Sequence, residues 1–149
     1  MQPVSDAPDS NLRLQRIRVL LVEDNSVDAE FVRWLLARCN TARFEVTRVE
    51  HLSAALPIAQ SMRCDVVLLD LLLPDSLGLA SLQEFALAAP RAPIVVLTGL
   101  DEELIALQAI GHGAQDCLVK GRDDMRLLSR SMRFAIERKA CEVRLGQRT

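Results

Sequence analysis

The sequence predicts a single α/β domain built around a parallel sheet that helices cover on both faces. Short apolar segments typical of buried strands alternate along the chain with longer segments typical of amphipathic helices. The segments 66–69 and 94–97 are continuously apolar, which is typical of strands in parallel sheets with both faces buried. The 149 residues are 50% hydrophobic and 26% charged, enough for one domain with one core.

Five strands and five helices are expected in strict alternation. The predicted strands span residues 17–22, 44–49, 65–70, 94–97 and 116–119. The predicted helices span residues 26–39, 52–62, 79–89, 101–110 and 123–145.

The first strand, Ile17–Val22, is followed by a helix for which Asn25 or Ser26 is the expected N-cap. One face of this helix is apolar, so we expect it to meet the sheet. We interpret Trp34 as a core residue for the same reason. The residues of that face are Val27, Phe31, Trp34 and Leu35.

The middle of the chain contains two prolines that bear on helix boundaries. Pro57 lies inside the predicted helix 52–62 and is expected to kink or shorten it. A turn-rich loop at 74–78 separates the third strand from the next helix, which ends before Pro90. This helix is therefore expected to be short.

The last two helices differ in their ends. Three acids at 101–103 match the positive N-terminus of the fourth helix, and Gly111 marks its end. The last helix, 123–145, is long, and its residues Leu128 and Met132 are expected in the core.

Composition restricts the remaining classes of protein. We expect residues 1–14 to be a disordered tail, 15–145 the folded domain and 146–149 a C-terminal tail. The sequence shows no signal peptide, and no apolar run reaches the roughly 18 to 20 residues of a membrane span. A cytoplasmic protein without membrane insertion is therefore expected. The four cysteines lack C-x-x-C spacing, which favours reduced thiols over a zinc or redox site.

Charge is distributed unevenly along the chain. Residues 120–149 hold nine Lys or Arg and four Asp or Glu, whereas residues 1–119 hold nine and sixteen, and together these give the net charge of −2. The basic residues of the last helix are interleaved with acids, and no recognition motif accompanies them. Direct binding of nucleic acid is therefore not expected.

The carboxyl ends of four predicted strands carry polar or charged side chains. In chain order they are Glu23 and Asp24, Asp70, Thr98, and Lys120. In an open parallel α/β sheet, ligands bind outside these strand ends. A charge at the end of a buried strand is costly unless a cation or hydrogen bonds compensate it. We therefore expect these residues to form one site.

The residue types at these ends suit phosphoryl chemistry. Three carboxylates repel one another unless a divalent cation joins them, and oxygen ligands of this kind suit Mg²⁺. The Thr98 hydroxyl and the Lys120 ammonium complement the oxygens of a phosphoryl group. Asp70 is then the expected nucleophile, forming an aspartyl phosphate.

Four segments carry a family resemblance. They are 19–25 (VLLVEDN), 66–75 (VVLLDLLLPD), 93–99 (PIVVLTG) and 113–120 (GAQDCLVK). In this order they resemble the receiver domain of bacterial two-component response regulators, over Ile17 to about Leu145. The resemblance implies a flavodoxin-like (βα)5 fold with strand order 2-1-3-4-5.

The resemblance also implies roles for particular residues. Asp70 accepts a phosphoryl group from a sensor histidine kinase or a phosphotransfer protein. Asp24, Asp70 and the backbone carbonyl of Leu72 bind Mg²⁺, and Glu23 holds the ion through water. Thr98 and Lys120 bind the phosphoryl oxygens. Such a domain is a phosphoacceptor rather than an enzyme, and takes part in its own phosphorylation and dephosphorylation.

Output is expected through contacts with a downstream protein, with a homodimer left open. No effector domain follows Leu145, so the chain is expected to be a stand-alone receiver or a module of a larger regulator or hybrid kinase. Two positions depart from the family pattern. Cys117 stands where an aromatic residue is common, and Gly121 stands where proline commonly follows the lysine. Both leave the phosphorylation chemistry intact but bear on how the signal propagates.

Three alternative functions are compatible with parts of this pattern. A haloacid-dehalogenase-type phosphatase needs a second Asp two residues after the nucleophile, where this chain has Leu72. A flavodoxin-like FMN protein expects a hydroxyl-rich phosphate loop where Glu23 and Asp24 lie. A scaffold that kept the fold without the chemistry would have lost an acidic or lysine position, and none is lost.

Overall fold

The computed structural model describes residues 15–71, 78–99, 103–119 and 125–148. These residues form one parallel five-stranded sheet in the order β2-β1-β3-β4-β5, which confirms the predicted fold and strand order. The strands are β1 (Gln15–Val22), β2 (Ala42–Val49), β3 (Val66–Asp70), β4 (Ile94–Thr98) and β5 (Asp116–Val119). The predicted tail 1–14 lies outside the described residues.

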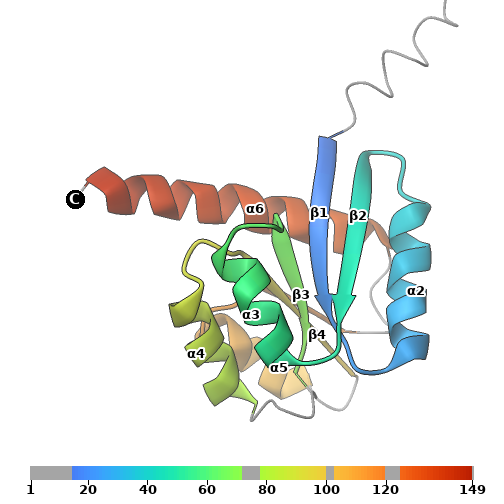
Figure 1. The fold of residues 1–149 in the computed structure, drawn as a ribbon, viewed down its shortest axis with the longest axis horizontal. Helices are drawn as coiled ribbons and strands as arrows, with labels where there is room; N and C mark the ends of the chain where they lie inside the picture. The colour runs from blue at the N-terminus through green and yellow to red at the C-terminus, as the bar shows by residue number, and fades with distance from the viewer. Residues whose placement is uncertain (1–14, 72–77, 100–102, 120–124, 149) are drawn as a thin grey trace, which may run out of the picture.

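Helices pack on both faces of the sheet (Figure 1). One face is covered by α3, α4 and α5, and the other by α2 and α6. This arrangement is the doubly wound one that alternating strands and helices require. The helices are α2 (Ser26–Ala37), α3 (Leu52–Gln60), α4 (Leu79–Ala88), α5 (Glu103–Ile110) and α6 (Met125–Arg148).

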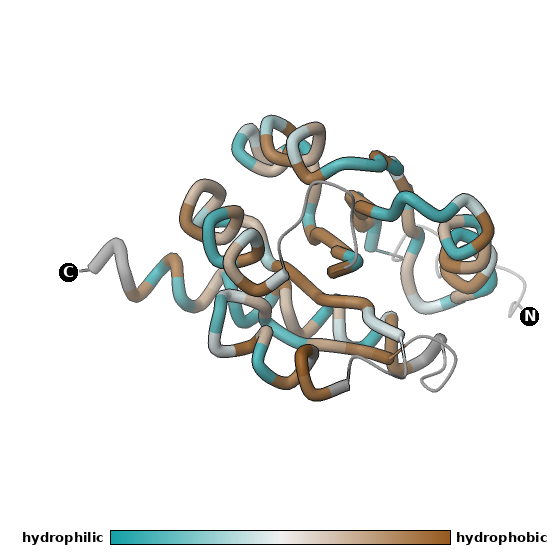
Figure 2. Tube along the Cα trace, turned by 90° about the horizontal axis from the view of Figure 1, so that it is seen from below, coloured by the Kyte–Doolittle hydropathy of each residue, from teal (hydrophilic) through white to brown (hydrophobic). Residues whose placement is uncertain are grey.

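The sheet separates two hydrophobic clusters. Alternate residues of each strand point to opposite faces. Leu20, for example, belongs to the cluster under α3, α4 and α5, and Leu21 to the cluster under α2 and α6. Figure 2 shows hydrophobic segments, in brown, running through the middle of the molecule between the helices. The α6 residues Leu128 and Met132 are buried in the second cluster, as predicted.

The predicted buried face of α2 is wrong. The residues that meet the sheet are Ala29, Val32 and Leu36, whereas Phe31 and Trp34 are 51% and 53% exposed. Both sets of residues recur at helical spacing, so the sequence offers two overlapping apolar faces. Small Ala29 and β-branched Val32 pack closely against the sheet, and the two aromatic rings remain outside. There they stack on each other with centroids 6.2 Å apart.

The ends of several helices also differ from prediction. Helix α2 ends at Ala37, two residues before its predicted end, and α4 ends at Ala88, one residue before. Helix α3 contains Pro57 and ends at Gln60, two residues before the predicted end. Helix α6 continues past the predicted end at Leu145 as far as Arg148, so residues 146–148 extend the helix rather than form a tail. Gly146 does not stop it, since a single glycine costs a helix only about 1 kcal/mol.

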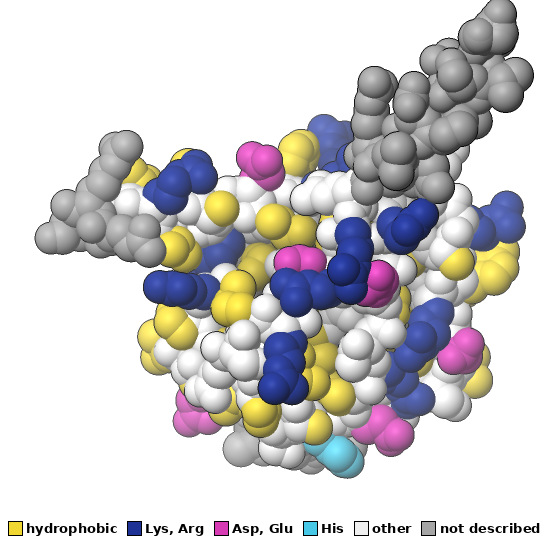
Figure 3. Space-filling model, turned by 45° about the horizontal axis from the view of Figure 1, so that its top comes forward, with side chains coloured by type: hydrophobic (Ala, Val, Ile, Leu, Met, Phe, Trp, Pro, Cys, Tyr) yellow, Lys and Arg dark blue, Asp and Glu magenta, His cyan; other side chains and the backbone are white. Residues whose placement is uncertain are grey.

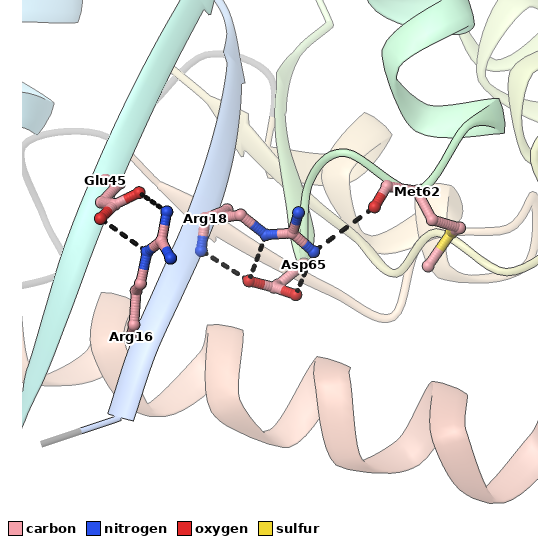
Figure 4. Close-up of polar contacts among 5 residues, drawn as sticks. All are labelled: Arg16, Arg18, Glu45, Met62 and Asp65. Carbon is pink, nitrogen blue, oxygen red and sulfur yellow. Dashed lines mark hydrogen bonds and ion pairs between the residues drawn. The ribbon is translucent and has the colours of Figure 1, made fainter. Parts of the chain in front are cut away.

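The amino-terminal edge of the sheet is rich in arginine. Figure 3 brings this edge forward, and dark blue basic side chains predominate over magenta acidic ones. Two ion pairs at this edge link β1 to β2 and to the start of β3 (Figure 4). The guanidinium of Arg16 donates to both carboxylate oxygens of Glu45 at 2.6 and 2.8 Å, which joins β1 to β2. Arg18 binds Asp65 in the same manner at the start of β3.

Candidate functional site

The strand register brings the predicted acidic residues together at the opposite, carboxyl-terminal edge. Strands β1 and β3 are adjacent, and Val22 lies beside Leu69. The next residue on each strand is therefore an acid, Glu23 beside Asp70. Strand β4 lies on the other side of β3, with Asp70 opposite Leu97, so Thr98 ends the neighbouring strand.

Three of the predicted site residues form a compact carboxylate cluster. One carboxylate oxygen from each of Glu23, Asp24 and Asp70 lies within 4.8 Å of the other two. Glu23 and Asp70 are buried, at 0% and 6% exposed, whereas Asp24 is exposed. The cluster therefore opens to solvent on the side of Asp24.

The loop that carries Glu23 and Asp24 is held at both of its ends. The Glu23 amide donates to the Val49 carbonyl at 3.0 Å, which extends the β1–β2 pairing by one residue. Asn25 is the N-cap of α2, as predicted, because its side chain accepts from the Asp28 amide at 3.0 Å. The acidic pair therefore lies in a short, fixed connection between strand and helix.

Arg48 of β2 is a residue at this edge that the sequence interpretation missed. Its Nε donates to the Glu23 carbonyl at 2.9 Å, and its terminal nitrogen donates to the Asp24 carbonyl at 3.1 Å. Two hydrogen bonds from one guanidinium fix two successive peptide groups. The role of Arg48 could have been predicted only from the pairing of β1 with β2. In that pairing Arg48 lies opposite Leu21, two residues before Glu23.

Thr98 places a hydroxyl at the same edge. Its Oγ1 is fully buried, and it has no hydrogen-bond partner among the described residues. A buried hydroxyl without a partner costs about 1 to 3 kcal/mol, so such groups are rare unless they serve a purpose. Thr98 ends β4, directly beside the strand that ends in Asp70.

Two of the predicted site residues, Lys120 and Leu72, lie outside the described residues, as does Gly121. Cys117, the other departure from the family pattern, is half-buried on β5 opposite Val96 of β4. Cys117 forms no disulfide, and neither do Cys39, Cys64 and Cys141.

The carboxylate cluster fits a divalent metal ion. The donors are hard oxygens, and they converge closely enough for one ion to reach all three residues. Two of the three carboxylates are buried, where like charges repel strongly in a medium of low dielectric constant. A bound Mg²⁺ would offset that repulsion, and the exposed position of Asp24 leaves a side on which the ion keeps water.

Comparison with known proteins identifies the family. A family model described as the response regulator receiver domain matches residues 19–143. This chain belongs to the receiver-domain family of response regulators. Receiver domains are the signalling domains of two-component systems. The match begins at Val19 within β1 and includes the four other strands of the sheet.

Relatives of this receiver domain include longer proteins. The cell cycle response regulator CtrA of Brucella ovis is 29% identical over 114 residues, which are 76% of this chain and 48% of CtrA. The chain thus spans about half the length of the curated relatives it matches.

Solved structures agree with the fold. A response regulator receiver domain protein from Clostridium thermocellum is 25% identical with a TM-score of 0.66, covering 84% of this chain and 98% of that one. NtrX from Brucella abortus is 25% identical with a TM-score of 0.72, covering 91% of this chain and 30% of NtrX.

The described helices of the receiver include none with the length and apolar character that a membrane span requires.

Proposed function

We propose that this receiver domain takes a phosphoryl group from a histidine kinase or a phosphotransfer protein onto Asp70, in a reaction that requires Mg²⁺. The observation that carries the proposal is the cluster of Glu23, Asp24 and Asp70, whose ligand oxygens lie within 4.8 Å of one another at the carboxyl edge of the sheet. This is the edge at which open α/β sheets bind ligands.

Each described residue has a distinct role in the proposal. Asp70 is the nucleophile: a carboxylate oxygen attacks the phosphorus, and the donor group leaves with its electron pair. Asp24 and Asp70 hold Mg²⁺ directly and Glu23 holds it through water. Bound there, Mg²⁺ would neutralise charge on the phosphoryl oxygens during transfer.

Thr98 and Lys120 are proposed to bind the phosphoryl oxygens after transfer. The buried hydroxyl of Thr98 gains a hydrogen-bond partner when a phosphoryl group is attached to Asp70. The phosphorylated form is thereby stabilised relative to the unphosphorylated form, which couples the chemistry at β3 to the end of β4. The signal then passes to a downstream protein by contact, and a homodimer is one form this contact can take.

Incubation with acetyl phosphate and Mg²⁺, followed by intact mass spectrometry, tests this function. The wild-type chain should gain one phosphoryl group, and the gain should disappear when EDTA removes Mg²⁺. Asp70→Asn should gain none, because an amide is a poor nucleophile and leaves the metal with one carboxylate fewer. Glu84→Gln, which removes the charge of an exposed acid on α4, is the matched control and should be labelled like wild type. Equal labelling of Asp70→Asn would contradict the proposal.

A further inference from the structure

A pocket lies between the connection from α2 to β2 and the N-terminal part of α6, at the amino-terminal edge of the sheet. Its volume is about 480 Å³, within the range of small-molecule sites. Thr41 lines it and immediately precedes β2, so the pocket lies at the end of β2 opposite to the one beside the carboxylate cluster. The polar lining residues are Arg38, Cys39, Asn40, Thr41, Ser129, Arg130 and Arg133.

Two of the three arginines in this pocket are positioned by aromatic rings. The guanidinium of Arg38 lies 4.7 Å from the centroid of the Trp34 ring, and that of Arg130 lies 5.4 Å from the centroid of Phe134. A cation–π contact orients the guanidinium without using its N–H donors. Both guanidinium groups therefore keep donors available for a ligand.

The third arginine, Arg133, is partly buried. Its terminal nitrogen donates to the Thr41 carbonyl, which ties α6 to the start of β2. Its Nε is fully buried and has no hydrogen-bond partner among the described residues. None of the three guanidinium groups forms an ion pair with an acid in the described part of the chain. Three arginines thus line one pocket, and no carboxylate of the described residues forms an ion pair with them.

The remaining polar groups of the pocket also suit an anion. The Cys39 sulfur lies 3.1 Å from Thr41 Oγ1 and 3.6 Å from Ser129 Oγ. Burial by itself would raise the pKa of the Cys39 thiol, but the hydrogen bonds with Thr41 and Ser129 outweigh burial and lower it. The hydroxyl groups of Thr41 and Ser129 can also donate to an anion in the pocket. Among the described residues, no acidic side chain lines the pocket, although Glu137 lines an adjoining hollow.

We propose that this pocket binds a small phosphorylated molecule that carries at least two negative charges. Guanidinium groups bind phosphate through paired N–H donors, and three of them match a multiply charged group better than a single carboxylate. The hydroxyls of Thr41 and Ser129 supply further donors. The ring of Phe134 provides an apolar wall for the rest of the ligand. The site is separate from Asp70 and does not depend on its phosphorylation.

Calorimetric titration of the full chain with inorganic pyrophosphate tests the proposal. EDTA is included so that no metal ion draws the probe to the carboxylate cluster. We expect one pyrophosphate bound per chain, with affinity at least about tenfold weaker in the double variant Arg130→Gln/Arg133→Gln. Arg63→Gln removes an exposed arginine from the same edge of the sheet and is the matched control. It should bind like wild type.

Amide chemical shifts of the wild-type chain keep the test independent of how well the variants fold. Pyrophosphate should shift amides of residues 38–41 and 129–134. Absence of binding, shifts confined to other residues, or equal weakening in the double variant and Arg63→Gln would each overturn the proposal. Labelling of Asp70 by acetyl phosphate should be the same in the double variant and in wild type, so failure here is distinguishable from failure of the phosphoacceptor function.

Discussion

Asp65 binds Arg18 through both its backbone and its side chain. The Asp65 carboxylate accepts from the Arg18 amide at 2.7 Å and from two guanidinium nitrogens at 3.2 and 3.1 Å. In return, the Asp65 amide donates to the Arg18 carbonyl at 2.7 Å. This double link fixes the start of β3 against β1, and with it the register that brings Asp70 beside Glu23 (Figure 4).

Asp65→Asn should therefore destabilise the fold, by about 1 to 2 kcal/mol at pH 7, because a charged acceptor is replaced by a neutral one. Burial alone would raise the pKa of Asp65, but hydrogen bonds from Arg18 hold it below its ordinary value of 3.8. A lowered pKa stabilises the fold at pH values above 3.8, and this contribution is lost as pH falls through the folded-state pKa. Urea denaturation at several pH values should show the variant and wild type converging in acid. A constant difference across pH would contradict the assignment.

Arg48→Met should weaken Mg²⁺ binding, because the guanidinium fixes the carbonyls of Glu23 and Asp24 and thereby the direction of their side chains. Titration calorimetry should show a several-fold higher Kd for Mg²⁺, and labelling by acetyl phosphate should need more Mg²⁺ to reach its wild-type rate. Arg43→Met, at the other end of β2, is the control. If removing the Arg48 charge instead tightens Mg²⁺ binding, repulsion between the two cations outweighs positioning.

Mg²⁺ should raise the melting temperature of the wild-type chain by binding the folded carboxylate cluster. Linkage gives about 1.4 kcal/mol of stabilisation when free Mg²⁺ is about ten times its Kd. The increase should be much smaller in Asp24→Ala and unchanged in Glu50→Ala, which removes an exposed acid after β2. Differential scanning calorimetry with and without Mg²⁺ measures both. An equal increase in Asp24→Ala and wild type would place the ion elsewhere.

Thr98→Val separates stability from signalling. The hydroxyl is buried without a partner among the described residues, so an isosteric methyl should leave the free energy of unfolding unchanged or raise it by up to about 1 to 2 kcal/mol. The same change should abolish the phosphorylation-dependent change in hydrogen exchange at β5, which pairs with β4 through Thr98 and Val119. Thr47→Val on β2 should retain that change. A Thr98→Val chain that is clearly less stable in urea would show that the hydroxyl has a structural partner.

The fold was predictable because the same pattern, an apolar strand followed by a helix, recurs along the chain. The central strands β3 and β4 are buried at every residue and are almost entirely apolar, and the alternation of strands with helices leaves few topologies. The buried face of α2 was not predictable in the same way. Phe31 and Trp34 are apolar and correctly spaced, yet the helix turns Ala29 and Val32 toward the sheet. The choice between two overlapping faces depends on the shape of the surface beneath the helix.

The carboxylate cluster was predictable from strand ends alone, because Glu23, Asp24 and Asp70 follow or end apolar strands whose carboxyl ends meet in a parallel sheet. Arg48 was not, because its importance depends on which residue of β1 lies opposite it. The arginine pocket at the other edge combines residues from the α2–β2 connection and from α6 that are about 90 positions apart in the chain. Such a site emerges only once the helices are packed.

The most direct test of the central claim is to locate the phosphoryl group on the wild-type chain. After incubation with acetyl phosphate and Mg²⁺, borohydride reduces an aspartyl phosphate to homoserine, and peptide mass spectrometry identifies the residue converted. The account predicts conversion at Asp70 and nowhere else, dependent on Mg²⁺. Conversion at Asp24 or at an acid outside the cluster, with Asp70 intact, would contradict it.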